Sequence, residues 1–401
     1  MSKSIYITTI EPNSGKSLVS LGFLRMMLNQ SSKVGYFRPI INKDKNGLYD
    51  DHTYTAINFF NLDIKYEDCY AFEQSEVVEL LSEGKQEKVI HDIIKKYKSL
   101  EAKYDYVLVE GTDFSGEGGF TELDVNLMVA KNLGIPVLIV GAGNDKKKKD
   151  FIHTMQLTYN SFIQKEVDVI GLIANKIEIE EMEYIKTELR KVIPKEVHID
   201  VVPKVNFLAN PTVKEVAEAL NGKVLFGEQF LDNSIGSYST GAMQLRNYLT
   251  RIKENALVIT PGDRADIILG ALQANASSNY PRIAGIILTG NLIPEESILK
   301  LIEGVQSTVP IVTVDGGTFG ISNKIGAVKA KIYASNSKKI VLALDTFDTY
   351  INVERLNKIL SKFSSDKLTP SMFQYNLLQR AKSCRKHIVL PEGNDQRIIE
   401  A

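Results

Sequence analysis

The sequence contains no tryptophan and only two cysteines, Cys69 and Cys384, which lie far apart in the chain. Two such cysteines make neither a disulfide framework nor a CxxC metal-binding pattern, so both are expected to be reduced thiols. The five histidines lack the close spacing of a metal-binding pair, which predicts ordinary surface or core roles for them. The composition therefore excludes a small protein held together by disulfides.

Long apolar runs and an excess of charge are also missing. No run approaches the roughly 20 apolar residues of a membrane-spanning helix, and the first residues lack the apolar segment and cleavage site of a secretion signal. The net charge is −1, which gives no electrostatic reason to expect binding to nucleic acid or a membrane surface. We therefore expect a cytoplasmic protein with neither of these partners.

The 401 residues are 44% hydrophobic and 24% charged, as in a folded protein of two or three domains. Over residues 1–208, short apolar runs alternate with helical stretches such as 17–30. This alternation predicts an α/β fold with a parallel sheet covered on both faces. The expected strands of this domain are residues 4–9, 33–37, 106–110, 136–140, 169–174 and 201–205.

The pattern pauses near residues 208–212 and then resumes, which predicts a second, smaller α/β domain over residues 212–360. Its expected strands are residues 224–226, 256–260, 283–288, 310–314 and 340–344. The polar segment 361–371 is predicted to be a linker. Residues 372–401 then read as a helix, a strand and the start of another helix. So short a segment cannot bury its own apolar faces, so we expect the sequence to stop inside a third domain.

Residues 8–17 join the first strand to the first helix and match the second half of the phosphate-loop pattern GxxxxGK[ST]. Ile10 stands where the pattern has its first glycine. Gly15 allows a close approach of the backbone to phosphate, Lys16 neutralises phosphate charge, and the Ser17 hydroxyl is a ligand for Mg²⁺. The alternative is an ordinary turn between a strand and a helix, in which the glycine serves only the geometry and the serine caps the helix.

Other residues fit the same site. Glu110 ends an apolar strand, where an acid can hold Mg²⁺, and Asn175 ends another, where an amide can contact a purine base. Arg38 is open to a role as a phosphate ligand or as a salt-bridge partner. Asp50 and Asp51 could add a carboxylate to the site, but we expect them to be ordinary residues of a surface loop. The residues predicted to bind the nucleotide or phosphate are Asn13, Ser14, Gly15, Lys16, Ser17 and Asn175, and those predicted to bind metal are Ser17 and Glu110.

Three segments resemble known families. Residues 8–17, 35–39 and 107–111 resemble the dethiobiotin-synthetase-like branch of P-loop proteins, which use ATP and Mg²⁺ to activate a carboxylate. That resemblance implies phosphate and metal roles for Lys16 and Ser17 and a metal role for Glu110, although Arg38 replaces the branch's lysine. The second domain resembles the DRTGG domain through its string GDRAD at 262–266.

The string RKHIVLPEGNDQR at 385–397 resembles the opening of the phosphate acetyl/butyryl transferase catalytic domain. A P-loop-like domain, a DRTGG-like domain and this opening follow one another as in long-form phosphate acetyltransferases. The resemblance implies a family that converts acetyl-CoA and phosphate to acetyl phosphate and CoA. The catalytic residues are then expected beyond Ala401, so the fragment itself is predicted to be inactive as a transferase.

Three hypotheses follow for the function. The first is a regulatory and assembly region that binds a nucleotide, with ATP and Mg²⁺ as candidates, or another small anionic effector. Its expected partners are its own C-terminal catalytic domain and further copies in a homo-oligomer. The second is a freestanding ATP-dependent ligase of the dethiobiotin synthetase type, against which Arg38 and Ile10 count. The third is a purely structural region.

Overall fold

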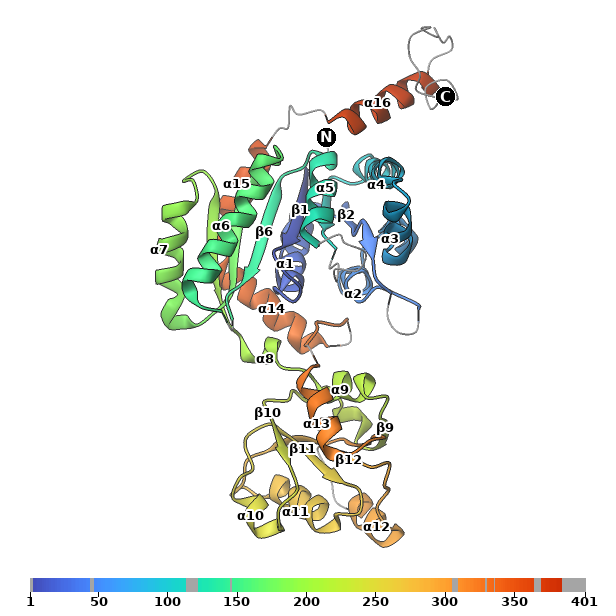
Figure 1. Cartoon of the computed structure of the whole chain (residues 1–401), viewed down its shortest axis with the longest axis vertical. Helices are drawn as coiled ribbons and strands as arrows, with labels where there is room; N and C mark the ends of the chain where they lie inside the picture. The colour runs from blue at the N-terminus through green and yellow to red at the C-terminus, as the bar shows by residue number, and fades with distance from the viewer. Residues whose placement is uncertain are drawn as a thin grey trace. The chain divides into compact units, whose positions relative to one another are not determined.

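A computed structural model describes residues 3–43, 47–112, 122–144, 146–304, 309–328, 330–334, 336–363 and 369–383 (Figure 1). The chain divides into two compact units. The first unit combines residues 1–204 with residues 332–401, and the second consists of residues 205–331. The second unit is therefore inserted in the chain between two parts of the first.

The first unit is built on a six-stranded sheet in the order β2-β5-β1-β6-β7-β8. Its strands are β1 (Lys3–Thr9), β2 (Val34–Phe37), β5 (Tyr106–Glu110), β6 (Val137–Ala142), β7 (Val169–Ile177) and β8 (His198–Pro203). All neighbouring strands pair in parallel, and nearly all their residues are buried. The predicted α/β fold with a parallel sheet is therefore confirmed. A separate parallel pair consists of β3 (Ile40–Ile41) and β4 (Phe72–Glu73).

In the described ranges, seven α-helices of this unit precede the insertion. They are α1 (Lys16–Leu28), α2 (Asp51–Phe60), α3 (Gln74–Ser82), α4 (Gln86–Glu101), α5 (Glu122–Leu133), α6 (Lys148–Gln164) and α7 (Met182–Val192). The α4 helix forms because apolar residues recur at three- and four-residue spacing, and Val89, Ile93 and Tyr97 bury one face. Within the ranges that the structure describes, no helix has the length and apolar character needed to cross a bilayer.

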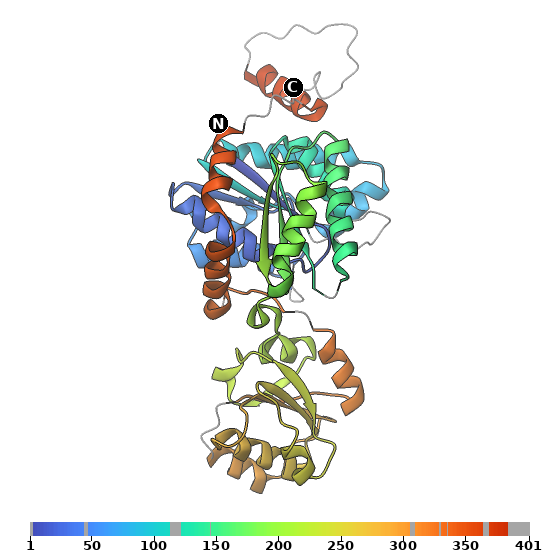
Figure 2. The same ribbon diagram turned by 90° about the vertical axis from the view of Figure 1, so that its left-hand side faces the viewer.

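After the insertion the chain returns to the first unit as α14 (Ser337–Tyr350), α15 (Val353–Lys362) and α16 (Pro370–Ser383). The α14 helix packs against α1 and β8, and α16 packs against α4 and α5. Ile340 and Leu344 of α14 share a small apolar cluster with Leu21 of α1. In Figure 2, α14 and α15 appear in orange and red along one side of the first unit.

This return differs from the sequence prediction, which assigns residues up to 360 to the second domain and expects a strand at 340–344. Residues 340–344 belong to α14, and the chain from Ile332 onward belongs to the first unit. The helix begins at Asn336, whose side chain accepts a hydrogen bond from the N–H of Lys339. The predicted linker 361–371 overlaps the end of α15 and the start of α16, and its residues 364–368 lie outside the described ranges. The strand predicted at 387–390 also lies outside them.

The second unit has a five-stranded sheet in the order β10-β11-β12-β13-β9, in which only the pairing of β9 is antiparallel. Its strands are β9 (Lys223–Phe226), β10 (Ser237–Thr240), β11 (Ala256–Pro261), β12 (Ile283–Thr289) and β13 (Ile311–Thr313). Its helices are α8 (Asn206–Ala209), α9 (Val213–Ala219), α10 (Leu245–Leu249), α11 (Ala265–Ala276), α12 (Glu296–Gly304) and α13 (Thr318–Gly326). Two apolar clusters cover the two faces of this sheet.

Candidate functional site

The predicted phosphate loop joins β1 to α1 at the carboxyl end of the first unit's sheet. The β1 strand lies inside the sheet, between β5 and β6. From β1 the chain runs toward β2 on one side, and from β6 it runs to β7 and β8 on the other. Ligands of open α/β sheets bind outside the carboxyl ends of the strands, where the direction of the connections changes. The topology therefore places this loop where a ligand is expected.

Gly15 is the N-cap residue of α1 and adopts the left-handed conformation, with a φ of +84°. A Cβ atom added there would lie 2.1 Å from Nδ2 of Asn175, so both backbone conformation and space favour glycine. Among the described residues, no side chain caps α1, and the first turn of the helix contains no acidic residue. The start of α1 therefore presents the positive end of the helix dipole without a side-chain cap, which favours an anion.

The end of β7 holds the loop in place. Nδ2 of Asn175 donates to the carbonyl oxygen of Ser14 at 2.9 Å, and Nζ of Lys176 donates to that of Asn13 at 2.7 Å. Oδ1 of Asn175 accepts the N–H of Lys176 at 2.8 Å. The amide of Asn175 therefore positions the loop through both its nitrogen and its oxygen. Its predicted contact with a nucleotide stays a prediction.

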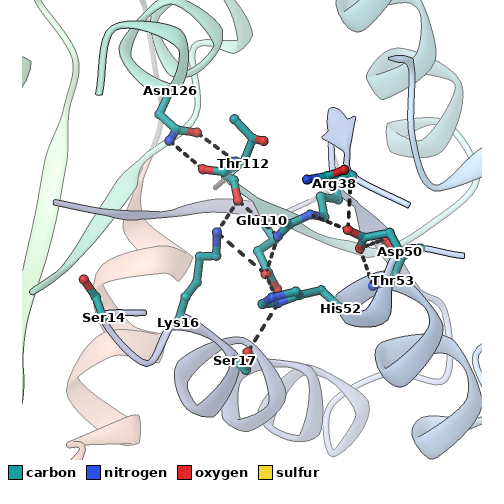
Figure 3. A network of polar contacts seen from close by, with 12 residues as sticks. Ser14, Lys16, Ser17, Arg38, Asp50, His52, Thr53, Glu110, Thr112 and Asn126 are labelled. Atoms are coloured by element: carbon teal, nitrogen blue, oxygen red, sulfur yellow. Dashed lines mark hydrogen bonds and ion pairs between the residues drawn. The ribbon is translucent and has the colours of Figure 1, made fainter. Parts of the chain in front are cut away.

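Lys16 is almost completely buried, with 3% of its surface exposed. Its Nζ donates to the carbonyl oxygen of Gly111, directly after β5, and lies 3.9 Å from Oε1 of Glu110. Figure 3 shows the side chain extending from the start of α1 toward the end of β5. The ammonium group therefore lies inside the site, next to the uncapped helix end.

Glu110 is buried among basic groups. Its Oε1 lies 2.7 Å from Nη1 of Arg38 and 2.8 Å from Nδ1 of His52, and its Oε2 accepts a hydrogen bond of 3.0 Å from the hydroxyl of Tyr36. Burial by itself would raise the pKa of Glu110, but the charge and hydrogen bond of His52, with Arg38 and Lys16, lower it to about 2. The carboxylate therefore stays charged and is neutralised by protein side chains.

Ser17, the other predicted metal ligand, lies near the same histidine. Its Oγ is 3.3 Å from Nδ1 of His52. Both residues, with Glu110 and Ile332, line a cavity of about 10 Å³, which has room for about one water molecule. Nowhere in the described part of the chain do three or more His, Cys, Asp or Glu side chains gather as a metal cluster.

The chain after β5 is fixed by Asn126 of α5. Oδ1 of Asn126 accepts the N–H of Thr112 and the hydroxyl of Tyr6, and its Nδ2 donates to the carbonyl oxygen of Thr112. These three bonds set the position of Gly111, which binds Lys16 (Figure 3). Most of the glycine-rich segment that follows, residues 113–121, lies outside the described ranges.

Two residues of this site, Asp50 and His52, are not among the predicted site residues. Asp50 is buried, accepts the N–H of Thr53 as the N-cap of α2, and lies 3.4 Å from Nε of Arg38, so its predicted place in a surface loop is wrong. His52, expected to have an ordinary role, contacts both Ser17 and Glu110. The signal for Asp50 is the spacing of Asp and Thr three residues apart at the start of a helix. No local signal identifies His52.

In the second unit, the string GDRAD at 262–266, which carries the resemblance to the DRTGG domain, leads into α11. Arg264 donates to both carboxylate oxygens of Asp266, at 2.8 and 2.9 Å, and to the carbonyl oxygen of Met243 at 2.9 Å. These bonds tie the loop after β10 to the start of α11. Arg264 and Asp266 of this string therefore hold two neighbouring segments of the second unit together.

Comparison with known proteins supports the resemblance seen in the sequence. The chain is 38% identical over its whole length to a phosphate acetyltransferase of Nitratidesulfovibrio vulgaris and 35% identical to one of Synechocystis. It spans 58% of the length of each of these relatives. The resemblance to phosphate acetyltransferases is therefore confirmed.

Similarity to solved structures is weaker. A variant of the McdA protein of Cyanothece in complex with ATP gives a TM-score of 0.34 at 14% identity and covers 51% of this chain and 84% of its own. The CBS and DRTGG domains of the Clostridium perfringens pyrophosphatase, with the activator diadenosine tetraphosphate, give a TM-score of 0.26 at 20% identity, over 39% of this chain and 63% of the other. Likenesses at this level do not identify a ligand.

Two family models match the chain. Residues 215–328 match the DRTGG domain, which confirms that expectation for the second unit. Residues 3–213 match the family described as AAA domain. Because this match covers more than half of the chain, the protein belongs to that AAA domain family.

Proposed function

We propose that this chain is the regulatory region of a phosphate acetyltransferase, and that residues 13–17 bind the phosphate groups of a nucleotide or another anionic effector. The similarity to phosphate acetyltransferases over the full chain supports the first part. The observation that carries the second is the uncapped start of α1 beside the buried Lys16. An uncapped helix end with a neighbouring cation is a favourable place for phosphate.

In this proposal the effector takes over contacts that the protein now makes with itself. Lys16 turns from the carbonyl oxygen of Gly111 toward a phosphate oxygen, while Lys176 adds a second positive charge at the loop. The backbone N–H groups after Gly15 point along the axis of α1 and stabilise the rest of the anion's charge. Binding therefore changes the environment of α1.

The α1 helix also offers a route for regulation. It packs against α14, and Ile332 lines the same cavity as Ser17. Ile332 directly follows Lys331, the last residue of the second unit. We propose that effector binding alters the hydrogen exchange of residues 205–331, because the two units are covalently joined at this point. Regulation of this kind requires an effector that binds two conformations with different affinity.

The acetyl transfer between CoA and phosphate is proposed for the longer protein. This chain spans only 58% of its relatives, and we propose that the remainder contains the catalytic residues. Residues 1–401 are accordingly expected to show no transferase activity. We also propose that the region assembles as a homo-oligomer, which light scattering of the purified chain tests.

Calorimetric titration with ATP, ADP and inorganic phosphate tests the binding proposal. In wild type we expect heat with at least one of these probes. Lys16→Ala removes a charge-assisted hydrogen bond and is expected to weaken binding by about tenfold or more. The control is Lys149→Ala, an exposed lysine of the run at 146–149, which should bind as wild type does. Absence of heat with all three probes would refute the binding proposal.

A further inference from the structure

A phosphate loop of this kind implies a magnesium ion, and Ser17 and Glu110 are the two residues expected to hold it. The structure tests that expectation through the surroundings of these two side chains. His52 lies between them, with its Nδ1 2.8 Å from Oε1 of Glu110 and 3.3 Å from Oγ of Ser17. A metal ion that bridged the two oxygens would need the place that this ring nitrogen holds (Figure 3).

The remaining surroundings of Glu110 are also unsuited to a cation. Nη1 of Arg38 lies 2.7 Å from the same Oε1, and Nζ of Lys16 lies 3.9 Å from it. The other oxygen, Oε2, accepts the hydroxyl hydrogen of Tyr36. Magnesium binds oxygen ligands at about 2.0–2.1 Å in an octahedral arrangement that tolerates little distortion. The two basic side chains of Arg38 and Lys16 repel such an ion, and the ring nitrogen of His52 occupies a further contact of the same oxygen.

The charge of the whole cluster leads to the same conclusion. Two buried carboxylates, Glu110 and Asp50, face two permanent cations, Arg38 and Lys16, with Lys176 at the loop nearby. The carboxylates are therefore already neutralised, and the cluster has no negative charge left to attract a metal ion. A site that relies on magnesium needs the opposite balance, because its acids must remain available to the ion.

We propose that this site binds its phosphate-bearing ligand without a divalent cation, with Arg38 and His52 taking the place of the metal beside Glu110. This inference rests on the proposed anion binding by residues 13–17 and specifies its chemistry. The ligand class is a phosphate, diphosphate or triphosphate group bound as the free anion. Glu110 then neutralises the charge of Arg38, and it does not contact a metal.

The test is a titration of the complete chain with ATP in two buffers, one with EDTA and one with excess MgCl₂. We expect dissociation constants that agree within about threefold, or tighter binding in EDTA. Binding that needs MgCl₂, or that is about tenfold tighter with it, would overturn the inference while leaving the anion site intact. Absence of heat in both buffers, with ATP and also with ADP and inorganic phosphate, would instead overturn the proposed function, and this inference with it.

Glu110→Gln separates a metal-bound site from a metal-free site further, because the two predict opposite changes in the affinity for ATP. If Glu110 held magnesium, its loss would weaken ATP binding in MgCl₂. If Glu110 neutralises Arg38, its loss leaves more positive charge at the site and ATP binds more tightly in EDTA. The matched control is Glu303→Gln, because Glu303 is an exposed residue of α12 in the second unit. This variant should change the affinity for ATP neither in MgCl₂ nor in EDTA. Should Glu110→Gln fail to fold, the two-buffer comparison on wild type still decides the question.

Discussion

Gly22 of α1 and Phe347 of α14 lie so close together that a Cβ atom added to Gly22 would come within 2.1 Å of the Phe347 ring. The same ring meets Phe23 edge to face, with ring centroids 5.6 Å apart. The missing side chain at Gly22 therefore lets the helix that follows the inserted unit pack directly on the helix that follows the phosphate loop.

Gly22→Ala should destabilise the first unit. Alanine improves helix propensity by up to about 1 kcal/mol, but the clash with a buried ring typically outweighs this and leaves a net loss of about 1–3 kcal/mol. Urea unfolding measures the change. Gly320→Ala on α13 is the matched control, since nothing lies within 4 Å of its added Cβ, and it should be neutral or slightly stabilising. Equal stability of the two variants would contradict the close packing of α14 on α1.

Gly15→Ala should abolish most ATP binding. The left-handed backbone at this position costs about 1–2 kcal/mol for any residue with a Cβ, and the new methyl group would displace Asn175, which holds the loop. We expect at least a tenfold loss of affinity by calorimetry. Gly84→Ala has the same kind of backbone, with a φ of +74°, and open space around its Cβ. That control should lose similar stability but bind ATP normally, and a parallel loss of binding would argue against a local effect.

The place of residues 13–17 between a strand and a helix could be predicted from sequence because its signal is local. A strand, the residues Gly15, Lys16 and Ser17, and a helix follow one another within a short stretch of chain. The strands of the sheet could also be predicted, since buried parallel strands are continuous apolar runs. The features that depend on neighbouring residues along the chain were therefore the predictable ones.

The features that could not be predicted depend on distant contacts. Glu110 looked like a metal ligand because an acid at a strand end has that role in related folds. Its neutralisation by Arg38 and His52 requires residues from two other parts of the chain. The run at 340–344 looked like a strand because it is short and apolar, but α1 offers it a helical packing partner from the start of the chain. Tertiary contact makes 340–344 part of a helix and surrounds Glu110 with basic side chains. The metal role of Glu110 stays a prediction, which the titration in EDTA and MgCl₂ tests.

The buried Glu110 predicts a measurable dependence of stability on pH. Its pKa is lowered in the folded protein to about 2, below the ordinary value of 4.5. A group with a lowered pKa stabilises the fold above its unfolded-state value, and this stabilisation is lost as the pH falls from about 4.5 toward 2. The full contribution is of the order of 3 kcal/mol.

Glu110→Gln isolates this contribution from the other carboxylates that titrate in the same range. The difference in unfolding free energy between wild type and variant should be largest near pH 7 and should shrink as the pH approaches 3. Urea unfolding at several pH values measures it, with Glu303→Gln as the control for a lost surface charge. A difference that stays constant with pH would contradict the lowered pKa.

The insertion of the second unit predicts which parts of the chain fold together. Residues 1–204 alone lack α14, so the buried Leu21 and Phe23 on α1 would lose the packing of Ile340 and Phe347. Loss of so large an apolar contact typically costs several kcal/mol. We expect this fragment to unfold at a lower urea concentration than the whole chain, or not to fold at all.

Replacing residues 205–331 by a flexible Gly/Ser linker should, in contrast, preserve the first unit. The linker keeps α14 attached, so it can pack on α1 and β8 as before. This variant should unfold cooperatively and bind ATP with the wild-type affinity in EDTA, since every contact of Lys16, Arg38 and His52 with Glu110 lies within the first unit. If the fragment 1–204 proved as stable as the linker variant, α14 would not be part of the first unit's core. If only the linker variant folds, the return of the chain after the insertion is what completes the first unit.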